Sequence, residues 1–329
     1  MPSKKANKAA ASAPKYSPPT SGILSYFPSS WVPYAELIRL EKPHGIYMIW
    51  YPYIMGLLYS ARISENTLSL ELLCKRALDL TIWTFILRST GCAWNDNVDQ
   101  DYDRKTARCC NRPIARGAIS TVQGHIYVAA LTGLGFTSIQ HFPVECTFDA
   151  CAILLLAAIY PFGKRFTHFA QVPLGATLSG AIVMAQHSVG IDPLSNENLR
   201  PTACLVVSII LLVVFYDVVY ARQDTVDDLK SGVKGMAVLF RNWIKTLLLS
   251  LVSGIAALLF LAGKFADMRR AFFYSSVGGT ALGLLTMIMV INTSQVARYA
   301  GRFYILAIGC LLGGFAVECY DKYEAVFTW

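Results

Sequence analysis

The stretch TIWTFILRSTGCAWNDNVDQDYD, residues 81–103, is apolar in its first half and acidic in its second. The apolar half belongs to a run centred near Phe85 that reaches the length of a membrane-spanning helix, for which about 17–25 residues are needed. Four Asp residues then fall within eight positions, at 96, 99, 101 and 103. The stretch therefore predicts a transmembrane helix that carries a cluster of acids to one face of the membrane.

Long apolar runs recur along the whole chain. Of its 329 residues, 54% are hydrophobic and only 15% are charged, and its mean hydropathy is +0.44. Soluble domains carry about 25% charged residues, so this chain has too little polar surface for a soluble protein of its size. We therefore predict an all-α polytopic membrane protein with nine transmembrane helices, centred near Tyr51, Phe85, Leu131, Leu155, Ala181, Leu211, Ala256, Leu284 and Ile308.

The formal net charge of +8 follows from the expected membrane topology. Lys and Arg residues concentrate in alternate loops, beginning with the N-terminal tail and the loop after residue 103. Such an excess marks the cytosolic side, which predicts a cytosolic N-terminus and a C-terminus on the opposite side. Arg269 and Arg270 are the main exception. The positive charge is thus no evidence for nucleic acid, and we expect a lipid bilayer and no nucleic acid as partner.

The first 28 residues are predicted to form a disordered cytosolic tail, because they are rich in Lys, Ala, Ser and Pro. They contain neither the apolar core of a signal peptide nor the Arg-rich amphipathic pattern of a mitochondrial presequence. Residues 29–329 are predicted to form a single transmembrane domain, in which 31–41 lie along the membrane interface before the first span. The nine Cys residues include no CxxC pair, and we expect them to behave as small apolar residues.

Polar residues recur every four positions at the end of the opening stretch. Asn95, Asp99 and Asp103 share one face of a continued helix, because residues four apart are neighbours on a helix surface. Asp96 lies beside this stripe. The pattern predicts an acidic helix end rather than an irregular loop.

A second acidic stretch, FYDVVYARQDTVDDLKSGVKG at residues 215–235, ends another apolar run. Its Asp217, Asp224 and Asp228 are spaced by seven and four residues and again lie near one helical face. The loop charges place both acidic stretches on the cytosolic side. One such stretch would be an ordinary solvated helix end, but two matched stretches on one side indicate a joint function.

The two clusters predict a site for metal ions and a diphosphate. Carboxylates on one face repel each other, and a bound cation removes the repulsion. Mg²⁺ binds one or two carboxylates together with phosphate oxygens of a substrate, so we expect Mg²⁺ as the cofactor. Nearby bases could neutralise the remaining phosphate charge, namely Arg108, Arg112, Arg116, Lys164, Arg165, Lys230 and Lys234.

These residues resemble the UbiA family of intramembrane aromatic prenyltransferases. The resemblance extends from about residue 39 to residue 240, and five stretches carry it in the expected order. They are RLEKPHG (39–45), NDNVDQDYD (95–103), NRPIARG (111–117), YPFGKRFTHFAQVPLG (160–175) and YDVVYARQDTVDDLKSGVK (216–234). The last three predicted helices contribute only general hydrophobicity.

The resemblance implies a nine-helix bundle with a central cavity, capped by the two acidic stretches. It implies Mg²⁺ coordination by Asp99, Asp103, Asp224 and Asp228, with assistance from Asp96. Asn95, which would assist with the metal as well, is expected to bind the diphosphate together with Arg108, Arg112 and Lys164. Tyr160 would project into the same cavity as Lys164, and Asp217 and Tyr220 would lie deeper, closer to the reacting carbon. These three are the expected catalytic residues.

The implied reaction is Mg²⁺-dependent transfer of a prenyl group from a prenyl diphosphate to an aromatic acceptor. The motifs look most like those of hydroxybenzoate-type members and of fungal enzymes that farnesylate polyketide phenolic acids. The absence of a presequence in this tail favours the second group, with farnesyl diphosphate and an orsellinic-type acid as substrates in meroterpenoid biosynthesis at the endoplasmic reticulum. The alternative is a 4-hydroxybenzoate polyprenyltransferase of ubiquinone biosynthesis in the mitochondrial inner membrane. A transporter is disfavoured, because transporters place ionisable groups near the bilayer midplane and these acids lie at helix ends.

Overall fold

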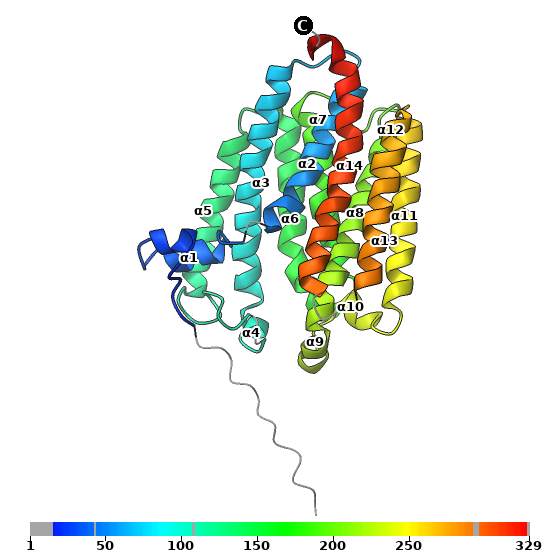
Figure 1. Ribbon diagram of the computed structural model, residues 1–329. Helices are drawn as coiled ribbons and strands as arrows, with labels where there is room; N and C mark the ends of the chain where they lie inside the picture. Colours follow the sequence, from blue (N-terminus) through cyan, green and yellow to red (C-terminus); the bar gives the residue numbers. More distant parts are fainter. Residues whose placement is uncertain (1–15, 43, 107–108, 292–295, 328–329) are drawn as a thin grey trace, which may run out of the picture.

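The protein is a bundle of long helices. The computed structural model describes residues 16–42, 44–106, 109–291 and 296–327, with the side chains of 44, 164, 227, 231, 296–300 and 324–327 excepted. Within these ranges the chain forms helices and no strand. The long helices run side by side along the height of the molecule, as Figure 1 shows.

The long elements are α2 (His44–Ile63), α3 (Leu70–Val98), α5 (Thr121–Ile139), α6 (Val144–Phe166), α7 (Gln171–Ser188), α8 (Leu199–Ala221), α11 (Ile244–Phe265), α13 (Thr280–Val290) and α14 (Val296–Phe327). The short elements are η1 (Ile23–Tyr26), α1 (Val32–Leu37), α4 (Gln100–Asp103), η2 (Arg222–Asp224), α9 (Thr225–Ser231), α10 (Met236–Leu239), α12 (Arg270–Phe272) and η3 (Phe273–Gly279). Every predicted span centre lies within one of the long helices.

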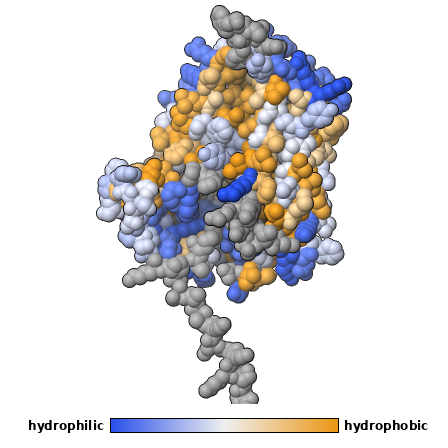
Figure 2. Space-filling view, in the orientation of Figure 1, coloured by the Kyte–Doolittle hydropathy of each residue, from blue (hydrophilic) through white to orange (hydrophobic). Residues whose placement is uncertain are grey.

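Five spans in the described residues are long and apolar enough to cross a membrane: Val144–Gly163, Leu199–Asp224, Ile244–Phe265, Arg270–Val290 and Gly301–Tyr323. The other four centres lie in α2, α3, α5 and α7, which fall outside this set. The number of nine membrane crossings therefore stays a prediction. Figure 2 shows hydrophobic side chains across the middle of one face of the bundle, with hydrophilic ones gathered toward its ends.

Small residues let neighbouring helices approach closely. A Cβ atom added to Gly175 of α7 would lie 2.9 Å from the backbone oxygen of Ile210 in α8, so the two backbones touch here. A Cβ atom added to Gly180, further along α7, would lie 2.9 Å from the side chain of Ile153 in α6. Small residues at helix interfaces allow this close approach in membrane proteins.

A helix cap and two glycines mark where the helices and loops near the acidic stretches begin and end. The Ser120 hydroxyl accepts a hydrogen bond from the Gln123 N–H at 3.2 Å, and the Gln123 side chain accepts one from the Ser120 N–H at 2.9 Å, which starts α5. Gly117 and Gly232 have φ angles of 80° and 74°, a left-handed conformation that glycine adopts without strain. The chain therefore turns sharply after each acidic stretch.

The two acidic stretches lie at the same end of the bundle. Figure 1 shows α4 and α9 at its lower end, and the described C-terminal residues of α14 at the upper end. We call these the motif end and the far end. At the far end, Glu318 of α14 accepts hydrogen bonds from the Arg62 side chain at 3.1 Å and the Arg269 N–H at 2.7 Å.

Part of the predicted disordered tail is ordered. Residues 1–15 lie outside the described part of the chain, but 16–28 include the short η1 and a packed Tyr16, whose hydroxyl donates to Glu36 at 2.9 Å. Helix α1 follows within the segment expected at the membrane interface. The boundary at residue 28 therefore does not separate disordered from packed residues.

Candidate active site

The first acidic stretch keeps its helical register although α3 ends at Val98. The Asp99 N–H donates to the Asn95 carbonyl at 2.8 Å, and the Asp103 N–H donates to the Asp99 carbonyl at 2.9 Å. Asn95, Asp99 and Asp103 consequently line the same cavity, as their spacing predicts. Helix α4 carries the last of them beyond the end of α3.

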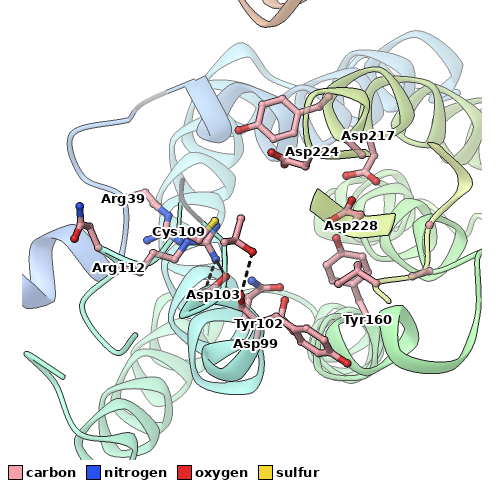
Figure 3. Close-up of a pocket in the computed structure, with 18 of the residues that line it drawn as sticks. Arg39, Asp99, Tyr102, Asp103, Cys109, Arg112, Tyr160, Asp217, Asp224 and Asp228 are labelled. Atoms are coloured by element: carbon pink, nitrogen blue, oxygen red, sulfur yellow. Dashed lines mark hydrogen bonds and ion pairs between the residues drawn. The ribbon is translucent and has the colours of Figure 1, made fainter. Parts of the chain in front are cut away.

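The second stretch reaches the cavity from the other side. Asp217 lies in the last two turns of α8, Asp224 ends η2, and Asp228 lies in α9. All three line the cavity that the first stretch lines. In Figure 3 they lie across an open space from Asp99 and Asp103.

This cavity, which we call the polar chamber, has a volume of about 760 Å³. Carboxylates from α3–α4 and from α8–α9 share it with Arg112, Lys42 and Lys234. Part of its lining, which we call the apolar wall, is apolar and includes Ala221, Val233, Ala237 and Val238. The chamber thus offers both signs of charge and an apolar surface to one ligand.

Asp96 does not face the polar chamber with the other aspartates. Its Oδ1 pairs with Arg39 at 2.7 Å and with Arg112 at 3.1 Å, and the residue is 1% exposed. Arg112 also pairs with Asp103 at 2.8 Å. Asp96 therefore fixes the two arginines at the chamber wall, whereas Asp103 belongs both to this network and to the chamber.

The network changes the acidity of its members. Burial lowers the pKa of Arg112, but the carboxylates of Asp96 and Asp103 outweigh this and hold its pKa above the usual value. Burial raises the pKa of Asp103, and the neighbouring Asp96 adds to this while Arg112 opposes it. Arg112 therefore stays positively charged. A further cation beside Asp103 would stabilise the ionised form of its carboxyl group.

Residues before the first long helix form one wall of the polar chamber. Arg116 pairs with Glu36 at 2.6 Å, and its guanidinium lies 3.7 Å from the centre of the Tyr16 ring. Tyr16 completes the triangle through its hydrogen bond to Glu36. We call these three residues the N-terminal clasp, which sequence analysis did not predict, because its members are far apart in the chain.

Arg88 is a charged residue inside a helix of the bundle. It is 5% exposed and donates to the backbone carbonyls of Ile38 at 2.9 Å and Lys42 at 2.7 Å. It thereby anchors the segment that carries Arg39, whose φ of 59° is unusual for a non-glycine residue. The signal in the sequence was a lone arginine in an apolar run, which marks a functional position in membrane proteins.

A second, smaller cavity adjoins the polar chamber. We call it the apolar chamber; its volume is about 300 Å³. Residues of α2, α3, α6 and α7 line it, among them Tyr53, Leu87, Gly91, Ala157 and Leu178. Four residues line both chambers and so mark their junction, namely Arg39, Asn95, Arg112 and Tyr160.

The remaining expected residues are placed as follows. Tyr160 of α6 and Tyr220 of α8 line the polar chamber, the first at the junction. Arg108 and the Lys164 side chain lie outside the described part of the chain. Gln171, which sequence analysis missed, lines the chamber at the start of α7; its side-chain oxygen is buried and has no hydrogen-bond partner among the described residues.

The donors in the polar chamber fit Mg²⁺. This ion prefers hard oxygen ligands and keeps positions for substrate phosphates. Among the described side chains, no three His, Cys, Asp or Glu residues converge into a complete protein metal site. Carboxylates that face each other across a chamber suit an ion whose other ligands come from a diphosphate.

Comparisons with known proteins agree with this geometry. The sequence profile of the UbiA prenyltransferase family matches residues 49–315. The chain is 55% identical to the prenyltransferase ascA of Acremonium egyptiacum over 93% of this chain and 91% of the relative. It is 38% identical to the DMOA farnesyltransferase nvfB of Aspergillus novofumigatus over 91% of this chain and 94% of the relative.

Solved structures share the fold. The apo structure of a UbiA homolog from Aeropyrum pernix K1 superposes with a TM-score of 0.68 at 22% identity, over 83% of this chain and 97% of the other. A UbiA homolog from Archaeoglobus fulgidus bound to GPP and Mg²⁺ gives a TM-score of 0.59 at 18% identity, over 87% and 99%. These matches establish the all-helical architecture as the one seen in those structures.

Proposed function

The chain belongs to the UbiA prenyltransferase family, and we propose that it transfers farnesyl from farnesyl diphosphate to a phenolic acid of the orsellinic type. It is an integral membrane enzyme that transfers prenyl groups. Our proposal concerns the length of the prenyl chain, the identity of the acceptor and the residues that bind each of them. We further propose that it works in meroterpenoid biosynthesis at the endoplasmic reticulum.

One observation carries the proposed mechanism: carboxylates from two distant stretches line one chamber together with Arg112. A diphosphate brings several negative charges, which carboxylates alone would repel. Asp99, Asp103, Asp224 and Asp228 would hold Mg²⁺, which when bound supplies electrostatic stabilisation of the departing diphosphate.

Basic residues complete the diphosphate site. Arg112 is kept charged and oriented by Asp96 and Asp103, so its free donors can bind phosphate oxygens without further ordering. Asn95 can donate through its side-chain amide from the junction. Arg108 and Lys164, which follow the same motifs in sequence, are proposed to add charge here.

The reaction then takes place at the junction of the chambers. The allylic C–O bond breaks, the electron pair leaves with the diphosphate, and a delocalised carbocation remains. The phenolic ring attacks it to form a C–C bond, and the ring proton then passes to the released diphosphate, which restores aromaticity. Tyr160 and Tyr220 present aromatic faces near this cation, and Asp217, one turn deeper than Tyr220 on α8, supplies negative charge beside it.

The apolar chamber suits the aromatic acceptor. Its volume of about 300 Å³ is small, and its lining includes Arg39, Arg88 and Arg112 beside apolar residues. Among the described residues, Arg88 pairs with no carboxylate and donates to backbone carbonyls instead, so an acceptor carboxylate could neutralise it. The prenyl chain would instead leave the polar chamber along its apolar wall.

Two further observations support the substrate pair. A relative with 38% identity over nearly the whole chain is named for farnesyl transfer. An acidic acceptor also matches Arg88, which lines the small chamber and pairs with no carboxylate among the described residues. Both support a farnesyl donor and a phenolic acid over a neutral acceptor.

The test uses membranes that contain the protein. They are incubated with Mg²⁺, one of four prenyl diphosphates (dimethylallyl, geranyl, farnesyl or geranylgeranyl) and either 2,4-dihydroxy-6-methylbenzoic acid or 4-hydroxybenzoic acid. We expect the mass of a monofarnesylated dihydroxymethylbenzoic acid, and its loss on chelation of Mg²⁺ with recovery on readdition. Polyprenylated 4-hydroxybenzoate as the main product would favour the ubiquinone alternative, and Mg²⁺-independent turnover would contradict the metal assignment.

A further inference from the structure

We infer that Tyr53, held by Trp83, closes the apolar chamber and restricts the aromatic acceptor to a single ring with a short substituent. This inference rests on the proposed function, because it takes the acceptor to be the ligand of that chamber. It concerns the end of the chamber that faces away from the carboxylates.

The apolar chamber has a polar end and an apolar end. Asn95 and Tyr160 lie at the junction with the polar chamber. Leu87 precedes Asn95 by eight residues on α3, which is about 12 Å along a helix axis. Tyr53 of α2 and Leu178 of α7 line the chamber but not the junction, and we assign them, together with Leu87, to its apolar end.

The Tyr53 ring is fixed in place. The Trp83 indole N–H donates to the Tyr53 hydroxyl at 2.7 Å, and both residues are 1% exposed. Trp83 is itself packed against α5, where a Cβ added to Gly135 would lie 3.1 Å from its ring. Three helices thus hold one aromatic side chain at the chamber.

Behind Tyr53 the protein is solidly packed. Tyr53 and Trp83 belong to a buried cluster that continues with Leu57, Leu80 and Met184. A ligand group longer than the chamber would have to displace this core, and well-packed cores accommodate extra methylene groups poorly. The Tyr53 ring therefore acts as a stop.

The size of the chamber agrees with this limit. Small-molecule sites span about 300–1,000 Å³, so 300 Å³ is at the lower end. The space beside Gly91 is part of it, since a Cβ added there meets no heavy atom within 4 Å. The acceptor's carboxylate would stay near Arg88 and its hydroxyls near Asp96, which leaves the apolar end to a ring substituent.

Two variants test the stop from opposite directions. Tyr53→Leu lengthens the chamber, while Gly91→Val adds carbon atoms to it at a position where a Cβ meets no heavy atom within 4 Å. Tyr59→Leu is the control for the first, because Tyr59 is an equally buried tyrosine of α2 that lines neither chamber. Gly133→Val is the control for the second, because its added Cβ also meets nothing within 4 Å and it lines neither chamber.

The measurement is the ratio of kcat/KM for 2,4-dihydroxy-6-pentylbenzoic acid to that for its 6-methyl homologue, with saturating farnesyl diphosphate. We expect the ratio to rise about tenfold or more in Tyr53→Leu, the scale on which hydrophobic pockets discriminate methylene groups. It should fall in Gly91→Val and stay at the wild-type value in both controls.

Other results would overturn the inference. An unchanged ratio in an active Tyr53→Leu protein would do so. If that variant does not accumulate, Gly91→Val decides, and a ratio equal to that of Gly133→Val counts against the stop. A changed preference for prenyl chain length with a constant acceptor ratio would reassign the chamber to the donor but leave the proposed function standing. Absence of transfer by the wild-type protein would overturn both.

Discussion

Four aspartates within eight residues have three different surroundings. Asp96 is buried against Arg39 and Arg112, Asp99 and Asp103 line the polar chamber, and Asp101 is exposed beside Arg104. The difference follows from the helical period, because positions four apart share a face and positions in between do not. Identical side chains in one motif should therefore respond differently to the same substitution.

Asp99→Asn and Asp224→Asn should each lower product formation by about 100-fold or more, the scale of losing one electrostatic contact to a transition state. Each change removes a negative charge from the polar chamber and keeps the side-chain shape. Asp101→Asn is the matched control, because this carboxylate is 73% exposed and pairs with Arg104 outside the chamber. The two measurements are the amount of product, identified by its molecular mass, and the amount of protein in membranes.

Equal losses in all three variants would contradict the chamber as the metal and diphosphate site. Near-wild-type turnover of Asp99→Asn would contradict its assignment as a ligand. A loss confined to Asp99→Asn and Asp224→Asn would link the two facing stretches to one function.

At the scale of elements, the N-terminal segment belongs to the site. Through the clasp, Glu36 of α1 holds Arg116, which lies in the loop that also carries Arg112. Arg39, a little further along the same segment, holds Asp96. A segment expected only to lie along the membrane thus orients residues at the wall of the polar chamber, where we propose that the diphosphate binds.

Reversing the Glu36–Arg116 pair tests this. Glu36→Arg and Arg116→Glu should each lower kcat/KM for the prenyl diphosphate, by about tenfold if the coupling is in the middle of the range for contacting residues. The double variant should recover most of the loss, since it restores the ion pair with its charges exchanged. Steady-state kinetics of the four proteins provides the cycle, and strictly additive losses would mean that the pair does not position the loop.

Helices α7 and α8 cross closely because Gly175 has no side chain at the contact. Gly175→Ala should destabilise the protein by about 1–3 kcal/mol, because its Cβ would lie 2.9 Å from a backbone oxygen that cannot move independently. Gly133→Ala should be neutral or slightly stabilising, since alanine favours helices and no atom lies within 4 Å of the new Cβ. Thermal unfolding in detergent compares the two, and equal midpoints would show that the helices separate without cost.

At the scale of the whole molecule, the sequence predicted the features that follow from periodic patterns or from residues close together in the chain. Apolar runs predicted the helices, and the spacing of Asn95, Asp99 and Asp103 predicted their common face. The sequence could not predict contacts between distant positions that have no periodic signal. Tyr53 and Trp83 are ordinary aromatic residues in apolar runs, and only the fold joins them by a 2.7 Å hydrogen bond beside the apolar chamber.

The position of the clasp was hidden for the same reason, because Glu36 and Arg116 are 80 residues apart. Asp96 illustrates a finer limit. Its place beside the motif stripe was evident, but whether it faced a metal or two arginines depended on where the segment around Arg39 docks. Docking of that segment rests on Arg88 and three backbone carbonyls, which no sequence pattern encodes.

The orientation in the membrane is the remaining prediction for the molecule as a whole. The loop charges predict that the motif end faces the cytosol and the far end faces the other side. A glycosylation acceptor placed in the far-end loop between α7 and α8 should therefore be modified in microsomes, whereas the same tag in the loop between α4 and α5 should not. Arg269, one of the two exceptions to the charge pattern, pairs with Asp321 at 2.7 Å and donates its N–H to Glu318, so acids of α14 hold it at the far end. Glycosylation of the α4–α5 tag alone would invert the topology and place the carboxylates of the polar chamber on the side away from the cytosol.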